Sequence, residues 1–157
     1  MSVEIVVPLE EFRQVRDRFP DLLDDYARAV GNRLRKELPR LIHEMLTMFQ
    51  TGRLARSVRA YVGLHGVRVT IGEGVTDERG TNYTRFVFEG VQPHEMDQLK
   101  KGRTWPMVWS HAKGSGVAMR VMHPGQQART DIIQAIKQRI KEIAVEEATV
   151  FALMGAS

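Results

Sequence analysis

The chain has 157 residues, of which 43% are hydrophobic and 27% charged, with a formal net charge of +4, a mean hydropathy of -0.29 and no cysteine. This length suits one domain, and the composition is too apolar for a disordered chain. The lack of cysteine excludes disulfides, thiolate metal sites and cysteine nucleophiles. The sequence shows no apolar run of roughly 20 residues and no signal-peptide pattern. We therefore expect a soluble single domain over residues 1–157.

The positive charge is concentrated in the middle of the chain. Residues 51–130 contain 12 Lys and Arg against 6 Asp and Glu, whereas residues 1–50 and residues 131–157 each have a net charge of −1. A basic segment attracts nucleic acid or another acidic surface, although solvated cations also serve solubility. The densest cluster, Lys100, Lys101 and Arg103, is sparser than compact nucleic-acid motifs are. The scatter favours a solvated basic face.

The first part of the chain is predicted to be an arm and a short helix, over residues 1–19. Apolar residues alternate with other residues from Ser2 to Val7, which indicates a short strand or an extended arm. Pro8 is expected to begin a helical turn, because the missing N–H of proline has no consequence there. The Phe19-Pro20 pair is expected to end this turn, since a residue before proline avoids helical angles.

A long amphipathic helix is predicted over residues 20–50. Its apolar residues recur at steps of three and four, which places them on one face. Pro39 lies inside this pattern, removes one backbone hydrogen bond and should kink or split the helix near Arg35. Thr51-Gly52 is expected to end the helix, with the glycine in the left-handed conformation.

Two hairpins are predicted in the central segment 53–121. The first has strands over 54–62 and 67–71, with the glycine-flanked turn 63–66 between them. The second runs from Trp105 to Val121 and turns at Lys113-Gly114-Ser115-Gly116. A short helix over 82–89 separates the hairpins, with Tyr83, Phe86 and Val87 facing inward and Gly90 closing it.

A turn at His123-Pro124-Gly125 leads into a last amphipathic helix, predicted over 130–153. The order is therefore helix, hairpin, short helix, hairpin, helix. It predicts an α+β fold, in which an antiparallel sheet built from hairpins packs against a long N-terminal helix and a C-terminal helix.

The sequence contains no pattern that requires catalysis. His94, Glu95 and Asp97 are the densest group of possible metal ligands, and His111 or His123 could complete them. Their spacing matches no standard motif, however, and a polar loop explains them more simply. No serine has the nucleophile-elbow context, and no glycine pattern is typical of phosphate binding. We expect no catalytic residues, no metal and no cofactor.

The two tryptophans, Trp105 and Trp109, allow two interpretations. Exposed aromatic rings next to cations can stack on bases of single-stranded nucleic acid. At a spacing of four on a strand, however, both rings share one face with Met107. The spacing therefore favours packing in the core.

Three segments in a fixed order carry a resemblance to a known family: residues 51–57 after the long helix, residues 83–90, and residues 123–129 before the last helix. They are similar to the T-G-x-L-x-x-S, Y-A-x-x-x-E-x-G and H-P-G-x-x-A-R/P segments of the neck or tail-completion proteins of long-tailed bacteriophages. The matching positions are Thr51, Gly52, Leu54, Ser57, Tyr83, Glu89, Gly90, His123, Pro124 and Gly125. The resemblance covers residues 20–150. It departs from the family pattern at Thr84, where alanine is usual, at the adjacent Glu89 and Gly90, and at 130–132.

The resemblance implies a structural ring subunit of the virion neck, made in the host bacterial cytoplasm, with no catalysis and no membrane partner. A ring of six or twelve copies would join the head-connector or head-closure protein to the tail-terminator or tail-tube protein. Packaged DNA would pass through its lumen without sequence specificity. Lys100, Lys101, Arg103 and Lys113 would then contact the lumen or a neighbouring ring. The alternative is a small nucleic-acid-binding module or metal-dependent nuclease that uses the basic segment 94–113.

Overall fold

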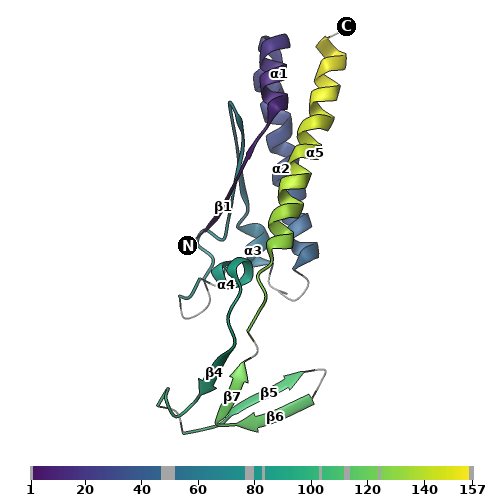
Figure 1. Ribbon diagram of the computed structural model, residues 1–157. Coiled ribbons are helices and arrows are strands. Elements are labelled where there is room, and N and C mark those ends of the chain that lie inside the picture. The colour runs from purple at the N-terminus through teal and green to yellow at the C-terminus, as the bar shows by residue number, and fades with distance from the viewer. Residues whose placement is uncertain are drawn as a thin grey trace.

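The computed structural model describes residues 2–46, 52–76, 80–82, 84–102, 104–111, 114–123 and 125–155. It has two regions (Figure 1). The larger, called the body here, contains residues 2–90 and 127–155 and combines long helices with a three-stranded antiparallel sheet. The smaller, called the β lobe, contains residues 91–126 and extends from one end of the body as two β ribbons. The predicted α+β class is confirmed.

The chain begins with a strand and a short helix. Strand β1 (Val3–Pro8) buries Ile5 and Val7 and exposes Val6, so the predicted alternation is confirmed. Helix α1 (Glu10–Arg18) begins after Pro8 rather than at it. Pro8 is instead the last residue of the strand and lies opposite Gly66. A proline is tolerated there because β1 is an edge strand and needs fewer N–H donors.

Two long helices form the frame of the body. A 3-10 turn (Pro20–Leu22) leads into α2 (Leu23–Met45), which lies beside α5 (Thr130–Gly155) (Figure 1). Pro39 lies within α2 and does not split it. The predicted helix over residues 130–153 is thus confirmed. The one predicted over 20–50 begins as an α-helix only at Leu23 and ends at Met45, and residues 47–50 lie outside the described residues.

The end of α2 differs from the prediction. The helix ends at Met45, and the Leu46 N–H caps it by donating to the Ile42 carbonyl over 3.0 Å. Gly52 does have a left-handed φ of 60°, as expected, but it precedes the one-turn helix α3 (Arg53–Arg56) instead of capping α2. Thr51 lies outside the described residues.

The sheet has the strand order β1-β3-β2. Strands β2 (Arg59–Gly63) and β3 (Gly66–Ile71) form the first predicted hairpin around a two-residue turn. The strand predicted over 54–62 is wrong in its first half, which is α3. The Ser57 hydroxyl donates to the Leu54 carbonyl over 2.6 Å and helps to close a helical turn there.

The hydrophobic core lies between α2, α5 and the inner face of the sheet. Its fully buried members include Leu34, Leu38, Ile42, Val67, Ile71, Ile132, Ile136, Ile140 and Ile143. Tyr26 is also buried, and its hydroxyl donates to the Ala144 carbonyl over 2.9 Å. Burial raises the pKa of Tyr26 well above its ordinary value, so this hydroxyl stays protonated.

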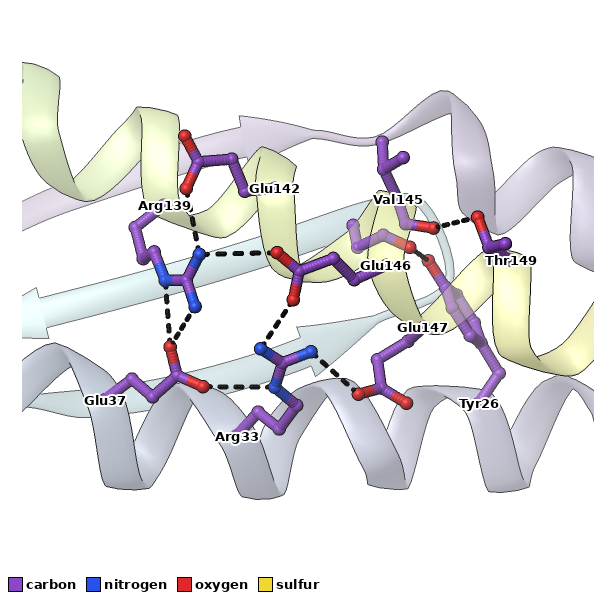
Figure 2. Close-up of polar contacts among 10 residues, drawn as sticks. Tyr26, Arg33, Glu37, Arg139, Glu142, Val145, Glu146, Glu147 and Thr149 are labelled. Atoms are coloured by element: carbon purple, nitrogen blue, oxygen red, sulfur yellow. Dashed lines mark hydrogen bonds and ion pairs between the residues drawn. The ribbon is translucent and has the colours of Figure 1, made fainter.

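A network of ion pairs crosses from α2 to α5 beside the core (Figure 2). Arg33 contacts Glu37 at 3.1 Å, Glu146 at 2.6 Å and Glu147 at 3.0 Å. Arg139 contacts the same Glu37 at 2.6 Å. Burial would raise the pKa of Glu37, but the hydrogen bonds from the two guanidinium groups outweigh it and lower this pKa. The network therefore connects the middle part of α2 with the middle part of α5.

The predicted short helix is α4 (Thr84–Glu89), and Gly90 follows it with a φ of 78°. Val87 is buried as expected. Phe86 is 42% exposed, so the prediction that its side chain faces inward is wrong. Thr84, Val87 and Phe88 lie at steps of three and four and share the buried face of the helix. Phe86 falls on the opposite face. Tyr83 lies outside the described residues.

Candidate functional site

The β lobe is connected to the body by a narrow stem. Val91 and Gln126 form an isolated antiparallel bridge with two N–H to carbonyl hydrogen bonds of 2.8 Å each. Two of the family-like motif residues, Gly90 and Gly125, flank this bridge with φ values of 78° and 80°. A Cβ atom at Gly90 would lie 2.6 Å from the Gln126 carbonyl oxygen, and one at Gly125 would meet the Val91 carbonyl oxygen. Both positions therefore require glycine for the strands to approach.

The lobe contains two ribbons. Strands β5 (Met107–His111) and β6 (Gly114–Ala118) confirm that a second hairpin is present. Its predicted bounds are wrong, because Gly114, Ser115 and Gly116 belong to β6 rather than to the turn, and Val121 belongs to another strand. Strand β4 (His94–Asp97) pairs with β7 (Arg120–His123), although the sequence indicated a polar loop at residues 94–97. This pairing spans the whole β5–β6 hairpin, so no local pattern in the sequence marks it.

The strand β4 places two carboxylates on one face. Asp97 is 4% exposed, and it accepts hydrogen bonds from Arg120 Nε at 2.7 Å and from the Leu99 N–H at 2.8 Å. Glu95 lies 3.2 Å from Lys100 Nζ and 3.8 Å from Arg120 Nε. Burial would raise the pKa of Asp97, but the bonds from Arg120 and the backbone lower it. Arg120 was not a candidate in the sequence, because its pairing depends on the β4–β7 register.

The residues that could have formed a metal site are not gathered into one. Glu95 and Asp97 are occupied by cations, and His94 Nδ1 lies 3.0 Å from the Gln92 carbonyl oxygen. His94 is opposite His123 in the β4–β7 register. Within the described part of the chain, no group of three or more His, Cys, Asp and Glu could hold a metal ion.

The predicted basic cluster is partly described. Lys100 and Lys101 lie in an exposed turn after β4, where the Lys101 N–H donates to the Gln98 carbonyl over 3.1 Å. Arg103 and Lys113 lie outside the described residues. Lys100 is engaged by Glu95, whereas Arg120, which sequence reasoning missed, belongs to the same ion-pair group.

The lobe also exposes large apolar side chains. Val108 and Val117 are direct cross-strand partners and are 76% and 62% exposed, which makes them one apolar pair on one face. Trp105 is 63% exposed and precedes β5, so the prediction that it packs in the core is wrong. The strand begins only at Met107, and the four-residue spacing of the tryptophans does not place both on it. Leu99 and Met122 are exposed as well.

The other motif residues support the body. Leu54 and Ser57 are buried, and the Ser57 hydroxyl accepts the Gly72 N–H over 2.8 Å. Glu89 is exposed and pairs with Arg85 at 2.6 Å. Arg129 donates from Nη2 to the Met45 carbonyl over 3.0 Å, where a cation suits the carboxyl end of α2. Strand β7 ends at His123, and Pro124 lies outside the described residues.

Comparison with known proteins gives no match: no family model, no curated protein and no solved structure is similar to the chain. None of the described helices is long and apolar enough to cross a membrane. The chemistry of the β lobe therefore has to be interpreted from its own residues. An exposed apolar and basic surface on a projecting region is typical of a binding surface for another macromolecule.

Proposed function

We propose that this protein is a structural, non-enzymatic subunit of a ring in the neck of a long-tailed bacteriophage. The ring joins the head-connector or head-closure protein to the tail-terminator or tail-tube protein, in six or twelve copies, and DNA passes through its lumen. The order of three family-like segments supports the phage assignment. The placement of two of their glycines, Gly90 and Gly125, at the stem of the β lobe gives these segments a common structural purpose.

One observation carries the assembly role: the β lobe projects from the body with Trp105, Val108 and Val117 exposed. Among the lobe residues whose side chains the structure describes, only the polar Asp97 and Gln98 are buried. An isolated two-stranded ribbon is only marginally stable in water. Burial of Val108, Val117 and Trp105 against another molecule would supply the missing apolar contact.

The sheets also leave strand edges unpaired within the chain. In the described sheets, β1 and β2 are the edges of the body sheet, and the two lobe ribbons have an outer edge on each strand. Edge strands are sites where neighbouring subunits can pair. Such contacts suit a particle that is assembled from many non-covalent interfaces.

The proposal is tested by size-exclusion chromatography with light scattering and by negative-stain microscopy of the purified chain. We expect a mass of six or twelve subunits and ring-shaped particles. A strict monomer, alone and mixed with connector and tail-tube proteins, would contradict the proposal.

The exposed cations of the lobe permit a second test, which separates a lumen from a dedicated nucleic-acid site. Lumen-facing Lys100 and Lys101 would bind DNA weakly and without sequence preference, with steep salt dependence. A nuclease or a specific binding module would cleave DNA or prefer one sequence. Fluorescence anisotropy with duplexes of unrelated sequence measures DNA binding and distinguishes a lumen surface from a specific site. The variant Lys100→Ala tests the lobe, and Lys137→Ala on α5 is its control.

A further inference from the structure

The two ends of the molecule carry opposite charge. The β lobe contains five Lys and Arg against two Asp and Glu, a net charge of +3. The far end of the body is formed by α1, the start of α2 and the end of α5 (Figure 1). We call this end the helical pole and define it as residues 10–33 and 146–155. It contains eight Asp and Glu against five Arg, a net charge of −3.

Both ends also expose apolar side chains. On the lobe, Val108 and Val117 form a cross-strand pair that faces solvent. On the helical pole, α5 exposes Val150 and Met154 beyond its last acidic residues, Glu146 and Glu147. The chain therefore carries a basic apolar surface at one end and an acidic apolar surface at the other.

We infer that the β lobe of one copy binds the helical pole of the next copy, in a head-to-tail contact between subunits. The inference rests on the proposed ring and specifies its interface. A contact of lobe with lobe, or of pole with pole, would bring like charges together. The head-to-tail contact instead pairs +3 with −3 and buries both apolar patches. Contacts between two different surfaces form a ring when the rotation closes.

The contact gives the exposed apolar pair of the lobe apolar neighbours on another subunit. Val108 and Val117 would lie against the outer face of α5, near Val150 and Met154. The exposed apolar pair on the outer face of the body sheet, Val6 and Tyr61, is a different surface. Glu4 and Arg68 pair there at 3.6 Å, and the exposed Arg59 adds one positive charge. That face therefore carries a smaller positive charge than the lobe does.

The test uses two double variants, each of which damages one surface. The lobe variant carries Val108→Glu and Val117→Glu, and the pole variant carries Val150→Ser and Met154→Ser. All four side chains are exposed, so circular dichroism and the melting temperature should stay close to those of the wild type. Each variant alone should associate at least about tenfold more weakly than the wild type, as measured by light scattering. The control Val6→Ser with Tyr61→Ser should assemble normally.

Mixing the two variants is the decisive measurement. The intact pole of the lobe variant can bind the intact lobe of the pole variant, so an equimolar mixture should form a dimer that neither variant forms alone. No recovery on mixing would overturn the head-to-tail contact, and normal association of one variant alone would favour a like-with-like contact instead. Rings that persist in both variants would overturn the inference and leave the proposed function intact. A wild type that is monomeric under all conditions would overturn both.

Salt dependence is a second readout that needs no variant. Opposite charges at the contact should make wild-type association weaken strongly between 0.1 M and 1 M salt, where the screening length falls from about 10 Å to about 3 Å. Association that is unchanged over this range would contradict an interface built on charge complementarity, even if a substituted lobe failed to fold.

Discussion

The body and the β lobe obtain their order in different ways. The body buries continuous apolar faces of α2, α5 and the sheet, and its ion pairs lie at the margin of that core. The lobe has backbone pairing, one buried carboxylate and a glycine stem, while Trp105, Val108 and Val117 are exposed. The difference teaches that the body has a core of its own, whereas the exposed apolar side chains of the lobe are those that the proposed contact would bury.

The largest expected effect is a cavity in the body. Leu34→Ala removes a fully buried side chain between α2 and its neighbours and should lower the free energy of unfolding by about 2–5 kcal/mol. Val108→Ala in the lobe removes an exposed side chain and should change it by less than about 0.5 kcal/mol. Urea unfolding of the monomeric state measures both. Equal losses would mean that the lobe has a core of its own.

The next effect concerns the stem. Gly125→Ala places an alanine in the left-handed conformation, and its Cβ would meet the Val91 carbonyl oxygen. We therefore expect the stem pairing to lose about 1–3 kcal/mol of stability. Gly102→Ala is the matched control, because Gly102 also has a positive φ, of 66°, but has open space around its Cβ position. Hydrogen exchange should show faster exchange at Val91 and Gln126 in the first variant only. Similar exchange in both variants would show that the close approach at the stem is unimportant.

A smaller effect is expected from the ion pairs of the body. Glu37→Gln removes a charge shared by Arg33 and Arg139, whose partly exposed side chains reduce the expected loss to about 1 kcal/mol. The folded-state pKa of Glu37 is lowered, so its contribution is complete above the ordinary pKa and disappears as the pH falls through the lowered value. The difference between wild type and variant should therefore vanish well below about pH 4. A constant difference down to that pH would exclude the ion pairs as its cause.

Much of the body could be predicted from the sequence, because its pattern is local. Apolar residues at steps of three and four define α2 and α5, and alternation defines β1 and the β2–β3 hairpin. The errors in the body are local as well. Alternation from Leu54 onward resembles a strand, but the Ser57 hydroxyl stabilises a helical turn there.

The lobe was harder to predict because its contacts are distant in sequence. Asp97 and Arg120 are 23 residues apart and meet only through the β4–β7 pairing. Trp105 has the size of a core residue, and its spacing to Trp109 favours burial, yet it precedes the strand and is exposed. Composition and spacing do not reveal that Trp105, Val108 and Val117 are exposed.

The smallest expected effect sharpens the comparison between the two regions. Asp97→Asn keeps the shape of the side chain but removes the charge that holds Arg120 at 2.7 Å. Because this pair orders only the lobe, the midpoint of global unfolding should stay unchanged, while the Leu99 amide, which donates to Asp97, should exchange faster. The same local change should occur in the wild type at acid pH, since the lowered pKa of Asp97 makes its ion pair disappear as the pH falls through that value. Amide exchange resolved by residue measures this. A shift of the global midpoint as large as that of Glu37→Gln would mean that the lobe and the body unfold as one unit, because an ion pair in an independently ordered lobe cannot stabilise the core of the body.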